Sequence, residues 1–198
     1  MKKILIALFL IFLFAFNAYA DEDIDVIVVG AGSAAPACTT QEEQLTQEGN
    51  APLGYDTALD RYAAAFSFTP DSTYSAKTVY VYAKKTGSPT ANITLSLCTD
   101  NGSPNVCTTA DAQYASATLT TSYAWIKFNF AAGYAISSGT TYWVKLFWDG
   151  AISASNYTFF GFLDSGGTKL YKISEDAVTW YSGDSTANGT LKIRDCVE

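Results

Sequence analysis

The chain of 198 residues contains no histidine, and this absence excludes several kinds of chemistry. Without an imidazole it has neither a Ser-His-Asp triad nor a His-ligated zinc site. Glutamate is also missing from residues 50–174, whereas most glycosidases need a pair of Asp or Glu side chains. Few groups therefore remain for acid–base catalysis near neutral pH, and we expect a protein without enzymatic activity.

The first 20 residues have the three parts of a secretory signal peptide. Lys2 and Lys3 precede an apolar run over 4–16, and Ala18 and Ala20 provide the small residues that precede a cleavage site. This run is shorter than the roughly 20 residues that cross a bilayer, so we expect cleavage after Ala20 rather than a retained anchor. The mature chain is then expected to be secreted, with the cell surface and the periplasm as further locations.

Acidic side chains outnumber basic ones by 19 to 12, which gives a formal charge of −7. Loss of the two leader lysines would change this charge to −9. A chain of this sign is repelled by nucleic acid and by anionic lipid, so we expect neither as a partner. No second long apolar segment follows the leader, so we expect no membrane insertion of the mature chain. The expected partners are an extracellular glycan, a protein or a second copy of the chain.

Four cysteines in an exported chain predict two disulfides. Cys98 and Cys107 flank a turn-rich segment, which suits a bridge across the neck of a hairpin. Among the three connectivities, this choice leaves Cys38 to pair with Cys196 and to join the two ends of the domain. The cysteines lack the paired C-x-x-C spacing that is typical of a tetrathiolate metal site.

From residue 61 onward, short segments rich in Val, Ile, Thr, Tyr and Phe alternate with turn residues. They predict eight strands, at 63–69, 77–85, 91–99, 125–131, 140–149, 156–162, 169–174 and 190–195. Strands without intervening helices favour antiparallel sheets stacked as an all-β sandwich. We assign 1–20 to the signal peptide, 21–60 to an extended N-terminal arm and 61–198 to the β-sandwich domain.

Alternation within these strands predicts which side chains face the core. In the strand at 77–85, Val79 and Val81 should point inward, which leaves Tyr80 and Tyr82 outside. One face of this strand is therefore expected to be buried and the other open to solvent.

Aromatic side chains on such outer faces are candidates for stacking on sugar rings. In the strand at 140–149, Lys145 indicates an outer face that Trp143 and Phe147 share. Both faces of this strand carry aromatics, so the alternative is that a loop or a neighbour covers it on both sides. Together with Tyr80 and Tyr82, these two residues are the candidate ligand contacts. Most other aromatic residues are expected to pack in the core or across strands.

The segment 25–35, DVIVVGAGSAA, matches the start of a dinucleotide-binding fold, but its context excludes that fold. A helix must follow the glycines directly, and Pro36 and Cys38 interrupt the chain there. We therefore expect no organic cofactor. A structural calcium ion held by turn aspartates is a further candidate, although no EF-hand array is present.

The apolar strand at 24–29 supports a different hypothesis. Ile24, Val26 and Val28 lie on one face of it and are candidate strand-donor residues, which would complete an open sheet edge of the next subunit and build a fibre. The alternative is that this strand pairs within its own domain.

Several motifs follow one another in the domain: AFSF at 65–68, TVYVYAKKTGSP at 78–89, DNGSP at 100–104 and SGTTYWV at 138–144. Their order resembles the choice-of-anchor group of bacterial surface β-sandwich domains, type R-like. The resemblance implies a jelly-roll-like extracellular domain with a binding role and no catalytic residues. These are packing and turn motifs, so they indicate fold more directly than function.

We expect a secreted, non-catalytic β-sandwich with a structural, adhesive or surface-interaction role. Two alternatives remain open. One is a carbohydrate-binding module that uses its exposed aromatics, and the other is a subunit of an extracellular fibre assembled by N-terminal strand donation.

Overall fold

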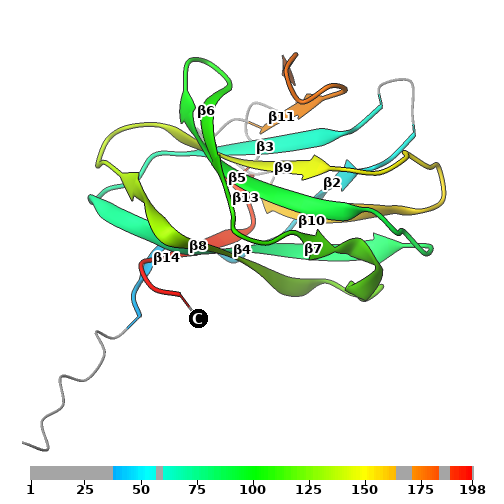
Figure 1. The fold of residues 1–198 in the computed structure, drawn as a ribbon, viewed down its shortest axis with the longest axis horizontal. Coiled ribbons are helices and arrows are strands. Elements are labelled where there is room, and N and C mark those ends of the chain that lie inside the picture. The colour runs from blue at the N-terminus through cyan, green and yellow to red at the C-terminus, as the bar shows by residue number, and fades with distance from the viewer. Residues whose placement is uncertain (1–37, 57–59, 164–170, 183–187, 198) are drawn as a thin grey trace, which may run out of the picture. The chain divides into compact units, whose positions relative to one another are not determined.

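The computed structural model describes residues 38–56, 60–163, 171–182 and 188–197. They form two antiparallel sheets that pack face to face (Figure 1). Within these ranges the one helical element is a short 3-10 turn, Ser116–Thr118. The all-β sandwich expected from the sequence is therefore confirmed. The signal peptide and the candidate donor residues Ile24, Val26 and Val28 lie outside the described residues.

The first sheet is organised around β4 (Tyr74–Thr86). Its other strands are β1 (Thr40–Gln44), β2 (Gly49–Leu53), β8 (Ala124–Ile136), β10 (Tyr157–Leu163), β13 (Asn188–Gly189) and β14 (Leu191–Arg194). β4 pairs with β8 along one edge, and with β14 and then β10 along the other. β1 extends the sheet beyond β14, and β2 extends it beyond β10.

The second sheet runs in the order β12-β11-β3-β9-β5-β6, with β7 also paired to β5. Its strands are β3 (Ala63–Phe68), β5 (Asn92–Asp100), β6 (Pro104–Thr109), β7 (Tyr114–Ala115), β9 (Tyr142–Trp148), β11 (Tyr171–Ser174) and β12 (Tyr181–Ser182). Consecutive strands from β3 to β5 and from β7 to β11 lie in alternate sheets, which gives the jelly-roll-like arrangement. Each of the eight strands expected from the sequence has a counterpart in these sheets.

The core lies between the sheets and is built from every second residue of each long strand. On β4, Val79 and Val81 are 0% and 4% exposed, as the alternation predicts. On β8, Ile126, Phe128 and Phe130 face the same core. Burial of this apolar area, at roughly 25 cal/mol per Å², is the main contribution that holds the two sheets together.

The sandwich begins earlier than the expected boundary at residue 61. β1 and β2 both lie in the segment predicted to be an extended arm, yet both are strands of the first sheet. Ala51 and Leu53 have no exposed surface. Their strand contains Gly49 and Pro52, which are depleted in strands, so its place is set by burial against β10 rather than by local propensity.

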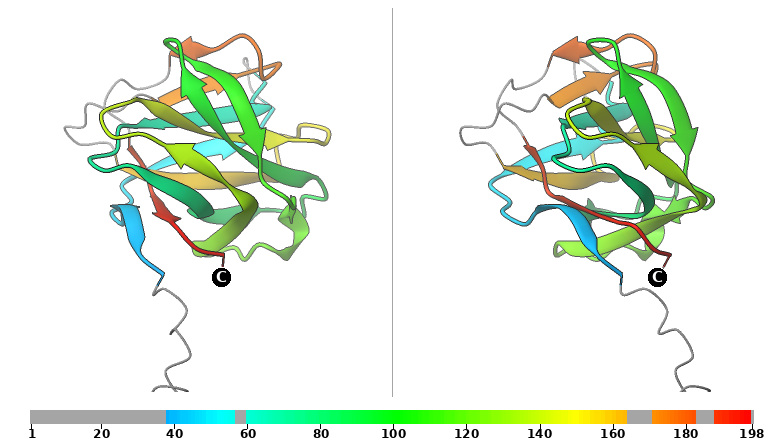
Figure 2. Two further views of the ribbon diagram at one scale, coloured as in Figure 1. Left: turned by 60° about the vertical axis from the view of Figure 1, so that its left-hand side comes forward. Right: turned by 90° about the vertical axis from the view of Figure 1, so that its left-hand side faces the viewer.

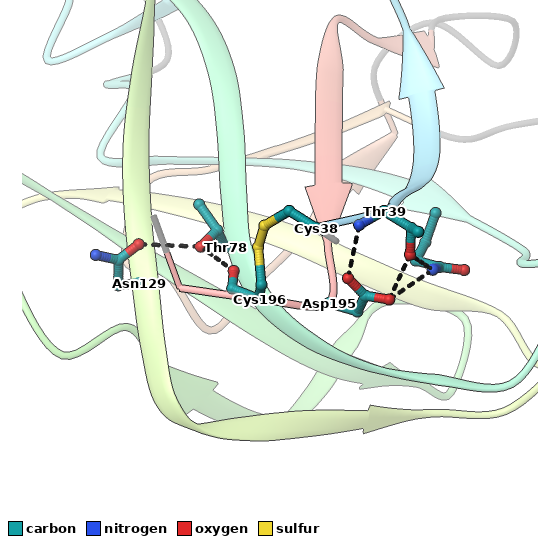
Figure 3. Close-up of a disulfide and its surroundings, with 7 residues drawn as sticks. Cys38, Thr39, Thr78, Asn129, Asp195 and Cys196 are labelled. Atoms are coloured by element: carbon teal, nitrogen blue, oxygen red, sulfur yellow. Dashed lines mark hydrogen bonds between the residues drawn. A yellow bond between two sulfur atoms is a disulfide. The ribbon is translucent and has the colours of Figure 1, made fainter. Parts of the chain in front are cut away.

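The bridge between Cys38 and Cys196 joins the start of β1 to the segment after β14 (Figure 3). Beside it, the Asp195 carboxylate accepts hydrogen bonds from the backbone N–H and the hydroxyl of Thr39. The hydroxyl of Thr78, on β4, donates to the Cys196 carbonyl at 2.6 Å. Both views in Figure 2 show the C-terminal end close to β1.

The second bridge joins Cys98 to Cys107 across the β5–β6 pair. Both predicted disulfides are therefore confirmed, and they indicate an oxidising, extracellular environment. In the described ranges, no helix has the length and apolar character needed to cross a bilayer.

Replacing both Cys38 and Cys196 with serine should destabilise the protein more than replacing Cys98 and Cys107. The partners are 158 residues apart in the first bridge and 9 in the second. Loop entropy then gives a loss of about 5 kcal/mol against about 2.5 kcal/mol in the free energy of unfolding. Equilibrium urea unfolding of the two double variants measures both losses, and an equal or larger loss for the short loop would contradict the prediction.

Candidate binding face

Aromatic and basic side chains gather on the outer face of the first sheet. The alternation that points Val81 into the core points Tyr80 and Tyr82 outward. β8 places Trp125 directly opposite Tyr82. We call this surface the aromatic face, and all its side chains are at least partly exposed. Its residues are Tyr80, Tyr82, Lys84, Tyr123, Trp125, Lys127, Phe159, Lys192 and Arg194.

Tyr82 is the central ring of this face. Its ring stacks on that of Tyr123, with centroids 5.1 Å apart and an interplanar angle of 20°. On its other side it meets Trp125 at 5.0 Å and 42°. Both distances fall within the range of favourable aromatic pairs. The three rings therefore form one continuous aromatic surface over β4 and the start of β8.

Lysine ammonium groups lie over these rings. Lys84 Nζ is 4.8 Å from the centroid of Tyr123 and 5.2 Å from that of Phe159, which stands opposite Lys84 on β10. Lys192 Nζ is 4.7 Å from the centroid of Trp125. These are cation–π distances. The rings therefore hold two positive charges close to the sheet.

The rest of the charge on this face comes from β14 and β1. The Arg194 guanidinium lies over the Tyr80 ring, 5.6 Å from its centroid. Lys192 also forms an ion pair with Glu43 of β1, with 3.3 Å between Nζ and Oε1. Lys84, by contrast, has no carboxylate partner among the residues that the structure describes. Positive charge therefore predominates near the centre of the face.

Tyr123 is held in place from β2. Its hydroxyl donates to the Asn50 side-chain oxygen, which also accepts a hydrogen bond of 3.0 Å from Gln47 Nε2. Burial, together with a smaller effect of the neighbouring Tyr82, raises the pKa of the Tyr123 phenol to about 12. The hydroxyl is therefore neutral and a donor at physiological pH.

Trp143 is buried, so it is not an exposed ligand contact, and the alternative of a covered outer face holds at this residue. It does lie on the outer face of the second sheet, but it is 0% exposed and packs with Ala65, Cys98 and Trp180. Its indole N–H donates to the Asp100 carboxylate at 2.6 Å. The alternation identified its face, but not the segment that covers that face.

The other sequence-predicted contacts are divided between the two sheets. Tyr80 and Tyr82 share the aromatic face, whereas Phe147 is partly exposed on the outer face of the second sheet, between β3 and β5. Sequence reasoning missed Phe159 and Tyr123. Alternation in β10 would have found Phe159, whereas Tyr123 precedes a strand and has no periodic signal.

Two aspartates away from this face have lowered pKa values. Backbone N–H groups of Thr179 and Val178 donate to Asp176 and lower the pKa of its carboxyl to about 2. The hydroxyl and N–H of Thr39 lower the pKa of Asp195. Both groups stay ionised, whereas a general acid needs a raised pKa. In the part of the chain that is described, no three Asp, Glu or Cys side chains cluster closely enough to bind a metal ion.

A pocket of about 400 Å³ opens beside Trp148 at the ends of β5 and β9. Its polar side chains already bind neighbouring loops. Asp149 accepts hydrogen bonds from the N–H and side chain of Asn92, and the Asn156 side chain accepts one of 2.7 Å from the Ser88 N–H. These groups hold the loops together, so the aromatic face is the stronger candidate site.

The raised pKa of Tyr123 predicts a change of stability with pH. Between about pH 10 and pH 12 the unfolded chain loses this proton while the folded chain keeps it, so rising pH favours unfolding. Tyr123→Phe removes this contribution. Urea unfolding should show the free energy of unfolding of the variant falling less steeply than that of wild type above pH 10. Parallel pH profiles would refute the assignment.

Comparison with known proteins gives no relative from which a function can be transferred. No family model matches the chain, no curated protein matches it, and no solved structure matches it.

Proposed function

We propose that the protein is a non-catalytic surface-interaction module that binds an extended carbohydrate chain through the aromatic face. The observation that carries the proposal is the contiguous surface of three partly exposed rings, those of Tyr82, Tyr123 and Trp125. The C–H groups on the faces of a pyranose ring are apolar, and flat aromatic side chains bury them favourably.

The shape of the face suits a chain rather than a single sugar. From Tyr80 to Lys84 the outward side chains of β4 extend over about 13 Å. Trp125 and Phe159 widen this row on either side of β4. A ligand lying along the strand would therefore meet several aromatic contacts in succession.

A non-catalytic role is supported by the residues that the chain lacks. Histidine is absent, and the long segment 50–174 contains no glutamate. The resemblance to the choice-of-anchor group implies a binding role of the same kind. The protein acts outside the cytoplasm, in a secreted form, at the cell surface or in the periplasm, and the two disulfides support this location.

Trp125→Ala should weaken glycan binding at least tenfold, because truncating a central Trp or Tyr in a binding surface typically costs about 2 kcal/mol. Tyr82→Ala should have a similar effect. A glycan array first identifies a ligand, and calorimetry then measures the affinities. Trp180→Ala, on the other sheet, is the matched control and should bind as wild type does.

Unfolding curves of the variants must show that each is folded at the assay temperature. The proposal fails if the wild-type protein binds no glycan, or if Trp125→Ala and Trp180→Ala weaken binding equally.

A further inference from the structure

We infer that the aromatic face selects acidic polysaccharides, in which the sugar rings carry carboxylate or sulfate groups. This inference rests on the proposed function and adds the chemical class of the ligand. It follows from where the positive charges lie, how they are held and what surrounds them.

The basic residues of this acidic protein are concentrated on one surface. Of the nine Lys and Arg residues in the described ranges, four project from the outer face of the first sheet. These are Lys84, Lys127, Lys192 and Arg194. Because the whole chain has a formal charge of −7, this grouping forms a basic patch on an otherwise acidic protein.

Charged and aromatic side chains alternate along the face. In one cross-strand row, Tyr80 stands between Lys192 on β14 and Lys127 on β8. The next outward row contains Tyr82 and Trp125. Successive outward rows are about 6.6 Å apart.

The row after that returns to positive charge, with Lys84 opposite Phe159. A polymer of acidic sugars likewise presents an apolar ring face and an anionic group in each repeating unit. The rows of the sheet therefore complement both parts of such a ligand.

The position of the ammonium groups also favours an anionic ligand over a neutral one. Lys84 lies over two rings and Lys192 over a third, so a neutral sugar must move these cations aside before it can stack. An acidic sugar that stacks must move them as well, but its anionic group then pairs with the displaced ammonium, an interaction that a neutral sugar cannot offer. At Lys192 this group competes with Glu43, whereas Lys84 has no such competitor among the described residues.

Polygalacturonate and its methyl-esterified form test this inference, because they share a backbone and differ in charge. Calorimetry at low salt should give at least tenfold tighter binding of the wild-type protein to polygalacturonate. The Lys84→Gln, Lys192→Gln double variant should lose at least tenfold in affinity for polygalacturonate and little for the ester. The affinities for dextran sulfate and for neutral dextran, compared in the same way, show whether the face recognises sulfate groups as well as carboxylates.

The chain offers a matched control on the second sheet. Lys145 and Lys172 also lie over tryptophan rings, at 5.8 Å from Trp180 and 5.9 Å from Trp143. The Lys145→Gln, Lys172→Gln double variant removes the same charge from the other side of the sandwich. It should bind polygalacturonate as wild type does, so an equal loss in both double variants would overturn the inference.

The remaining outcomes separate the two proposals. Equal affinity for polygalacturonate and its ester, lost in Trp125→Ala, would overturn the inference and leave glycan binding intact. Equal affinity for polyglutamate and polygalacturonate would also overturn it, because charge without sugar would then suffice. If the protein binds none of the four polysaccharides and no other glycan, the proposed function itself is refuted.

Discussion

The aromatic face depends on the two-residue alternation of a single strand, β4. This strand pairs with β8, β14 and β10, so it sets the register of most of the first sheet. The core requires Val79 and Val81 to point inward, and the same register then requires Tyr80 and Tyr82 to point outward. A slip of one residue would exchange the two sets. The stability of the fold and the position of the aromatic face therefore depend on the same register.

The N-terminal strands β1 and β2 supply partners for side chains of the aromatic face. β1 carries Glu43, which pairs with Lys192, and β2 carries Asn50, which accepts the Tyr123 hydrogen bond. Neither strand has a strong hydrophobic pattern, so each depends on its pairing with a neighbouring strand, β1 with β14 and β2 with β10. The bridge from Cys38 to Cys196 fixes β1 beside β14, next to the contacts that orient Lys192.

The sequence predicted features that follow from strand alternation and missed those that depend on contacts with distant segments. Alternation placed Tyr80 and Tyr82 correctly because β4 is a long strand with one buried face. At Trp143 the same reasoning left two interpretations open, because its strand has aromatics on both faces. A chain segment containing Trp180 covers the outer face, and no local pattern shows which distant segment supplies that cover. Tyr123 was missed for a related reason. It lies outside a strand, and its position is set by a hydrogen bond to Asn50 of β2.

The four tryptophans occupy unequal environments. Trp143 and Trp148 are 0% and 1% exposed, and Trp180 is associated with the second sheet. Trp125 is the one tryptophan on the aromatic face, where the Lys192 ammonium lies over its indole. Indole fluorescence responds to a nearby charge, so any event that moves or neutralises the Lys192 ammonium would change the emission of Trp125 more than that of the other three. The protein thus carries its own optical reporter at the surface where a ligand would bind.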